Sequence, residues 1–123
     1  MIHIMTGDWK LPNCPDMIID SHYVYSYINF KKYKPEYLPI SDIAFKDISN
    51  IDVEDSRYLT ADTSFPGIVV KDMPNPHNKP YRLIDGRHRI LKRLNDDKDT
   101  VNVYILNEQD IRKFYTDYGK YEI

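Results

Sequence analysis

The part of the chain best suited to chemistry is a short run, Asp85-Gly86-Arg87-His88-Arg89, which directly follows a strand-like segment. Hydrophobic periodicity predicts a helix from about residue 87 to 94, so the cationic side chains of this run would stand in its first turn. A helix N-terminus carries partial positive charge, and a cation placed there costs about 0.3–1 kcal/mol. That sign is unfavourable for stability but favourable for an anion, on which backbone N–H groups, the helix dipole and guanidinium groups would converge.

We therefore expect a phosphate-binding site at the start of this helix. Gly86 would permit a positive φ and a close approach of the backbone to the ligand. The predicted phosphate-binding residues of the run are Asp85, Gly86, Arg87, His88 and Arg89. An ordinary alternative is a tight Asp-Gly turn followed by two solvated arginines. The far end of the same helix also meets charges of the unfavourable sign, at Asp96, Asp97 and Asp99.

A short acidic cluster upstream is the second candidate for chemistry. Asp52, Glu54 and Asp55 could hold Mg²⁺ beside a bound phosphate or supply a general base. The ordinary alternative is a solvated loop, which acidic triplets in turn regions usually form. His88 titrates near neutral pH and is a candidate acid–base group. The candidate catalytic residues are thus His88, Asp55 and Glu54.

Other residues carry weaker signals. His3, His22 and His77 have no second ligand at the spacing of a zinc site, so no transition metal is predicted. The single cysteine, Cys14, excludes an internal disulfide and a CxxC redox pair. A basic rim around the phosphate site is expected from Arg82, Lys92 and Arg93. It would be too small for duplex DNA but would suit a nucleotide or a short single strand.

The elements that would position these residues form an α+β fold with a small mixed sheet. Strands are expected over residues 37–43, 66–71, 81–84 and 101–106, with the second and third forming a hairpin across a turn-rich connection at 72–80. Ile90, Leu91 and Leu94 share one face of the predicted helix and would pack on the sheet. A last helix is expected near 111–118, capped by Asn107 or Asp110 and ended by Gly119. Residues 48–59 fit either a weak helix or an irregular loop.

The first 36 residues are predicted to be an irregular extension containing a tyrosine-rich strand, and residues 37–123 the main domain. Tyr23, Tyr25 and Tyr27 alternate in sequence, which would place them on one face of a strand over residues 22–28. Packing across neighbouring strands is the commoner use of such a row, and stacking on bases the alternative.

Length and composition limit the possible functions. With 123 residues the chain is expected to form one core and one modest cleft. Hydrophobic residues make up 41% and charged residues 29%, which is ordinary for a globular protein. The formal net charge of -2 argues against a protein that coats duplex DNA. Neither a secretory signal nor an apolar run of roughly 18 residues is found, so the protein is expected in the cytoplasm, that of the host if a phage encodes it, with no membrane association.

The run 81–94, Tyr-Arg-Leu-Ile-Asp-Gly-Arg-His-Arg-Ile-Leu-Lys-Arg-Leu, together with the strand at 100–106, resembles the ParB/sulfiredoxin-like superfamily. Residues 38–43 look like the family's opening strand, 66–70 like its next strand and 107–119 like the helix that follows in sulfiredoxins. The resemblance implies a nucleotide-phosphate site at the helix N-terminus, with Gly86, Arg87, His88 and Arg89 holding phosphate oxygens and Arg57 assisting them. Family members bind ATP, ADP or CTP there, and some are described as nucleases or as a serine kinase.

The chain departs from two branches of this family. Sulfiredoxins carry their catalytic cysteine where this chain has Arg87, so thiol chemistry on a peroxiredoxin is not expected. ParB has glutamate there and continues into a helix-turn-helix domain, so a complete chromosome-partition factor is not expected. The hypothesis is therefore a domain that binds nucleotide or nucleic-acid phosphates, as a nuclease, phosphodiesterase or phosphotransferase. The candidate cofactor is a nucleoside phosphate with Mg²⁺. The alternative is a non-catalytic module whose tyrosine-rich segment engages a protein or a nucleic acid. Whether the chain is catalytic, and its oligomeric state, stay open.

Overall fold

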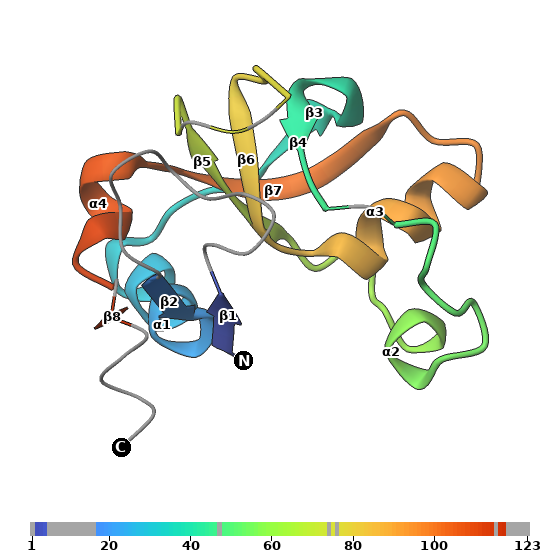
Figure 1. Cartoon of the computed structure of the whole chain (residues 1–123), viewed down its shortest axis with the longest axis horizontal. Coiled ribbons are helices and arrows are strands. Elements are labelled where there is room, and N and C mark those ends of the chain that lie inside the picture. The colour runs from blue at the N-terminus through green and yellow to red at the C-terminus, as the bar shows by residue number, and fades with distance from the viewer. Residues whose placement is uncertain are drawn as a thin grey trace.

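A computed structural model describes residues 2–4, 17–46, 48–73, 75, 77–114 and 116–117. They form an α+β fold around a curled, mixed, five-stranded sheet (Figure 1). Its strands in spatial order are β3 (Glu36–Pro39), β7 (Thr100–Asn107), β5 (Gly67–Lys71), β6 (Tyr81–Asp85) and β4 (Ile43–Ala44). The central strand β5 runs parallel to β7 and antiparallel to β6. β4 is parallel to β6, and β3 is antiparallel to β7.

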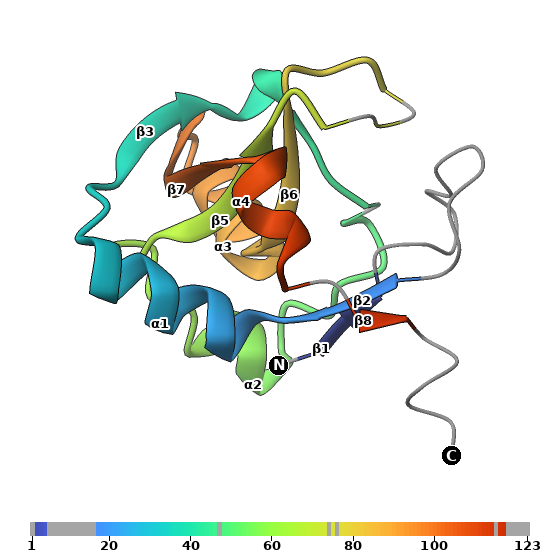
Figure 2. The ribbon, with the colours of Figure 1, turned by 90° about the vertical axis from the view of Figure 1, so that its left-hand side faces the viewer.

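The core is divided by β5, whose side chains alternate between two hydrophobic clusters. Ile68 and Val70 face a cluster with Val24 and Ile28 of helix α1 (Ser21–Lys31) and with Ile111 of helix α4 (Glu108–Arg112). Val69 faces the opposite cluster with Ile90 of helix α3 (Arg87–Asn95). α1 and α4 therefore cover one face of the sheet and α3 the other (Figure 2). Burial on both faces explains why this strand reads as a continuous apolar run.

The structure confirms the predicted strands at 66–71, 81–84 and 101–106 and the predicted helix at 87–94. It also confirms the hairpin formed by the first two of these strands. The predicted strand at 37–43 is instead broken by a turn of 3₁₀-helix, η1 (Ile40–Asp42). Pro39 is the last residue of β3, and the chain then crosses to β4 at the opposite edge of the sheet. The open choice at 48–59 resolves into turns followed by a one-turn helix, α2 (Ser56–Leu59).

The predicted tyrosine-rich strand at 22–28 is wrong, because these residues lie in helix α1. Val24 and Ile28, four residues apart, are the buried side chains of its inner face. Alternating tyrosines suggested a period of two, but the pair of aliphatic residues at helical spacing makes the contacts with the sheet. Tyr25 is half-buried, whereas 67% of Tyr23 is exposed, so the tyrosines do not share one face.

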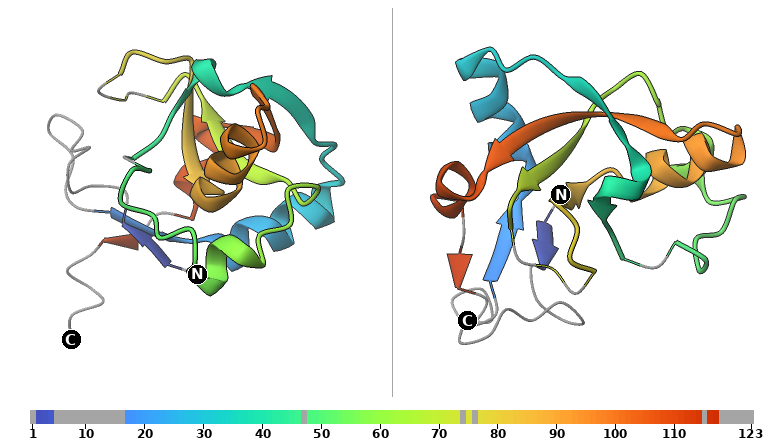
Figure 3. Two further views of the ribbon diagram at one scale, coloured as in Figure 1. Left: turned by 90° about the vertical axis from the view of Figure 1, so that its right-hand side faces the viewer. Right: turned by 90° about the horizontal axis from the view of Figure 1, so that it is seen from above.

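The last helix also differs from its prediction. α4 begins after Asn107, whose side chain accepts a hydrogen bond from the Asp110 amide at 2.7 Å, and it ends at Arg112. The chain then enters β8 (Thr116–Asp117), which pairs with β2 (Met17–Asp20) in a small antiparallel sheet completed by β1 (Ile2–Ile4) (Figure 3). That long-range pairing places residues 116–117 in a strand where the sequence predicts a helix. Gly119, its predicted end, lies outside the described residues. No helix in the described part of the chain is long and apolar enough to span a membrane.

Candidate anion site at the start of helix α3

The junction between β6 and α3 is built on two glycines that face each other. Gly86 precedes α3 with φ +122° and supplies no side chain to cap the helix. Its positive φ is the conformation expected for glycine at this turn. Gly67, on the neighbouring strand, has no room for a side chain, since an added Cβ would lie 2.5 Å from the Asp85 carbonyl oxygen. The backbone that enters α3 is therefore held at close range by β5.

Asp85 and Arg89 are tied to helix α1 through Tyr25. The Tyr25 hydroxyl donates a 2.7 Å hydrogen bond to Asp85 Oδ2, and the Pro66 carbonyl oxygen lies 3.1 Å from the Tyr25 hydroxyl oxygen. Arg89 Nη1 lies 3.7 Å from Asp85 Oδ2 and 3.5 Å from the Tyr25 hydroxyl. Burial raises the pKa of Tyr25 above its ordinary value, and the adjacent carboxylate of Asp85 adds to the effect. At neutral pH the tyrosine therefore keeps its proton and stays a donor.

Aromatic packing further limits the freedom of Arg89. Its guanidinium carbon lies 5.1 Å from the centroid of the Phe65 ring, and that ring lies 5.5 Å from the ring of Tyr25. Only 21% of the Arg89 side chain is exposed. Residues two apart on a helix do not face each other. Arg87 and Arg89 accordingly lie on different sides of α3. The contacts of Arg89 with Asp85, Tyr25 and Phe65 hold the β6–α3 junction against α1.

A second group of charges gathers around His88. Burial lowers the pKa of His88, and the positive charges of Arg57 and Arg87 lower it further, against the opposing influence of Asp55 and Asp85. The charges of two guanidinium groups thus act on the histidine, one from α2 and one from its own helix. Arg57 remains 63% exposed. The structure brings together Arg57, Arg87 and His88 of the sequence-predicted site, beside the N-terminus of α3.

Asp55 holds Arg57 in place through hydrogen bonds. Its Oδ1 accepts a 2.7 Å hydrogen bond from the Arg57 amide, which caps α2, and a 3.3 Å contact from Arg57 Nε. Hydrogen bonds from Arg57 hold the pKa of Asp55 below its ordinary value. A carboxylate so stabilised is a poor proton acceptor at neutral pH. Asp55 therefore fits the role of a positioning group better than the general base expected from the sequence.

The other acidic candidates do not join this group. Glu54 is exposed, and its backbone amide donates to Asp52 Oδ1 at 2.9 Å within the same turn. Across the described residues no three side chains of histidine, cysteine, aspartate or glutamate are grouped as they would be to hold a metal ion. The turn that contains Asp52, Glu54 and Asp55 is thus the solvated loop of the alternative interpretation, with Asp55 as its helix cap.

Arg82, Lys92 and Arg93 do not form the expected basic rim, because each side chain is buried or bonded within the protein. Arg82 is buried, with 3% of its surface exposed. Lys92 Nζ donates to the carbonyl groups of Tyr58, Leu59 and Ala61 at 3.1–3.4 Å, which closes the C-terminal end of α2 and holds α2 beside α3. Arg93 Nε donates to the Thr100 carbonyl at 2.8 Å. Long cationic side chains near helix ends are often used in this way.

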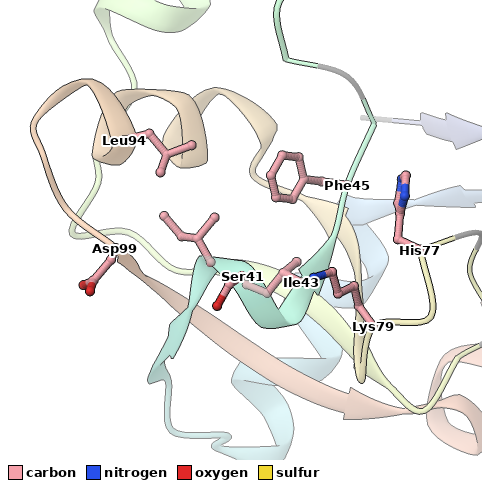
Figure 4. A pocket seen from close by; sticks show the side chains of 8 residues that line it. Ser41, Ile43, Phe45, His77, Lys79, Leu94 and Asp99 are labelled. Atoms are coloured by element: carbon pink, nitrogen blue, oxygen red, sulfur yellow. The ribbon is translucent and has the colours of Figure 1, made fainter.

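The sequence interpretation missed a shallow apolar hollow of about 500 Å³ (Figure 4). It lies between η1, β4, the end of α3 and the turn before β6. Its lining residues are Ile40, Ser41, Ile43, Phe45, His77, Lys79, Leu94 and Asp99. Leu94, expected to pack on the sheet, is 39% exposed and stands at the edge of this hollow, whereas Ile90 alone of its predicted face is fully buried. No local pattern could have indicated the hollow, because three segments far apart in the sequence, 40–45, 77–79 and 94–99, build it.

The pKa of His88 leads to a stability prediction. Because the folded state lowers this pKa below 6.5, the unfolded chain takes up its proton first as the pH falls. Stability is therefore expected to decrease from about pH 6.5 downward, through the folded-state pKa. Urea unfolding between about pH 5 and 8 should show a steeper loss in the wild type than in His88→Gln. The control variant is His22→Gln, at an exposed position, which should keep the pH slope of the wild type. Equal pH slopes in wild type and His88→Gln would contradict the prediction.

In comparisons with known proteins, no family model, curated protein or solved structure matches the chain. The site must accordingly be interpreted from its own residues.

Proposed function

We propose that this chain binds the phosphate groups of a nucleotide or nucleic acid at the N-terminus of α3. The observation that carries the proposal is the gathering of Arg57, Arg87 and His88 beside the start of a helix whose N-cap residue, Gly86, offers no capping side chain. The positive charges of Arg57 and Arg87 both lower the pKa of His88. A bound phosphate would offset these charges through charge-assisted hydrogen bonds.

The roles within this proposed site differ from residue to residue. Arg57 and Arg87 would contact phosphate oxygens, and the amides at the start of α3 would complete the receptor. Asp55 positions Arg57, and Asp85 with Tyr25 positions Arg89 and the junction. The order of β6, Gly86, α3 and β7 is also the order that the resemblance to ParB/sulfiredoxin-like proteins implies, which supports this choice of ligand.

The same contacts favour phosphate binding over phosphoryl transfer as the primary function. The pKa of Asp55 is lowered and its oxygens are occupied by Arg57, so it is not available to accept a proton. His88 is the group that a phosphodiester cleavage would use as its base, since its lowered pKa keeps the imidazole neutral at physiological pH. The alternative of a non-catalytic module would retain the phosphate site without this use of His88.

Calorimetric titration with inorganic pyrophosphate, ATP and CTP tests the proposal. We expect binding by the wild type and roughly a 10- to 100-fold weaker affinity for Arg87→Gln, because one charge-assisted hydrogen bond contributes about 1.5–3 kcal/mol. Arg112→Gln is the matched control, since Arg112 pairs with Glu108 on α4 and is expected to retain wild-type affinity. The absence of saturable heat with all three ligands would overturn the proposal.

A proton-linked readout gives a second, independent check. A bound polyanion should raise the pKa of His88, so NMR titration of its imidazole should move toward higher pH when pyrophosphate is added. An unchanged His88 titration in the presence of bound pyrophosphate would place the anion elsewhere and contradict the site.

A further inference from the structure

The outward face of α1 carries two strongly exposed aromatic side chains. Phe30 is 80% exposed and Tyr23 is 67% exposed. They are seven residues apart, which places them on the same side of the helix about 10.5 Å from each other along its axis. The residues between them on that side, Ser26 and Asn29 among them, are polar and exposed. The face thus presents flat rings on a polar background.

Lysines surround the C-terminal end of this face. Lys31, Lys32 and Lys34 follow Phe30 along the chain and are exposed. Lys113 comes from the end of α4, and its Nζ lies 3.7 Å from the centroid of the Tyr27 ring. We call Phe30 and these four lysines the lysine corner. The whole chain has a net charge of -2, so cationic side chains are concentrated here against the overall balance.

The backbone of the lysine corner is held in place at a cost to the fold. The Lys32 amide donates to the Asn29 carbonyl at 3.2 Å, and the Tyr33 amide donates to the Ile28 carbonyl at 3.1 Å. These two bonds close the end of α1 and require the residue after the helix to adopt a left-handed conformation. That residue is Lys32, whose φ is +58°. Glycine or asparagine is preferred at this position. A lysine that occupies it against the local preference suggests selection for its charge.

Three further rings support the corner from beneath. Tyr27 makes edge contacts with Tyr33 at 5.9 Å and with Phe114 at 5.5 Å between ring centroids. The Tyr33 hydroxyl donates to Asp110 Oδ2 at 3.0 Å, so this nearby carboxylate is already engaged by the protein. Lys31 and Lys113 lie over these rings, with the Lys31 Nζ 5.9 Å from the centroid of the Tyr27 ring. Glu36 is the next acidic residue along the chain.

We infer that the outward face of α1 and the lysine corner bind single-stranded nucleic acid. Phosphates would contact the lysines while unpaired bases stack on Phe30 and Tyr23, the combination that single-strand-binding surfaces use. A duplex would not offer the faces of its bases. An anionic membrane would also attract lysines, but its binding requires several apolar side chains to insert, and Phe30 is the only strongly exposed apolar side chain of the corner. This inference does not depend on the phosphate site at α3.

Fluorescence anisotropy with labelled oligo-dT and oligo-U of about 15 nucleotides tests the inference. We expect saturable binding at about 50 mM salt that weakens strongly by about 200 mM, with each phosphate contact adding about 0.7 to the slope of log affinity against log salt. Phe30→Ala should weaken binding roughly 5- to 100-fold, as expected for loss of one stacked base. Leu59→Ala, which shortens an exposed apolar side chain on α2, should leave the affinity unchanged.

Lys32→Gly separates binding from folding. Because glycine suits the left-handed position, this variant should unfold at a higher temperature than the wild type while binding the oligonucleotide more weakly and with a shallower salt dependence. No saturable binding of either oligonucleotide, equal binding by Phe30→Ala, tighter binding of a duplex of the same length, or binding to phosphatidylserine vesicles without oligonucleotide binding would each overturn the inference.

Discussion

Replacement of Gly67 by alanine is expected to lower the free energy of unfolding by about 3 kcal/mol, at the upper end of what overpacking a core usually costs. The added Cβ would lie 2.5 Å from the Asp85 carbonyl oxygen, a distance that requires the backbone to shift. Gly67 is buried and pairs with Val103 of β7, so β5 cannot move away without disturbing the centre of the sheet. Thermal unfolding should show the midpoint fall by roughly 10 °C.

The same substitution should also weaken anion binding, because the displaced backbone leads directly into α3. Gly86→Ala offers a comparison in which the added Cβ meets its nearest atom at 3.4 Å but the backbone has φ +122°. Its expected cost of about 1–3 kcal/mol would come from backbone strain rather than from overlap. A Gly67→Ala protein with the wild-type unfolding midpoint would show that β5 and the β6–α3 junction are not in the close contact described above.

Tyr25→Phe is expected to destabilise the fold by about 1–3 kcal/mol, the usual cost of removing the partner of a buried polar group. The Tyr25 hydroxyl donates to Asp85 Oδ2 at 2.7 Å, and 19% of the Asp85 side chain is exposed, so water replaces the lost donor poorly. Arg89 loses its contact with the hydroxyl in the same step. Chemical denaturation followed by circular dichroism measures the loss.

Tyr23→Phe is the matched control, because the same hydroxyl is removed two residues earlier from a side chain that is 67% exposed. Its effect should lie within about 0.5 kcal/mol of zero. A double-mutant cycle with Asp85→Asn should give a coupling of about 0.5–3 kcal/mol between Tyr25 and Asp85. Equal stabilities of the two tyrosine variants, or a coupling of zero, would mean that α1 does not anchor the start of α3 through this bond.

Much of the sheet and the helix that carries the candidate site could be predicted because their signals are local. Ile68, Val69 and Val70 form an uninterrupted apolar run in a strand buried on both faces. The Asp85-Gly86 turn and the amphipathic pattern that follows predict α3 without any knowledge of its neighbours. The tyrosine-rich segment was mispredicted because its aromatic alternation and its Val24–Ile28 spacing indicate different periods. Only docking against the sheet selects the helical one.

The candidate site was predictable in its residue types but not in its grouping. The chain alone determines that a glycine enters a helix whose first turn is cationic, since backbone preference and residue order are local properties. Tertiary structure decides that Arg89 turns toward Asp85 and Tyr25, and that the charge of Arg57 acts on His88. The reason is that a charged side chain takes the partner that lies nearest in space. That partner is set by how α1, α2 and the sheet pack, through contacts between residues as far apart as 25 and 89, which no short pattern encodes.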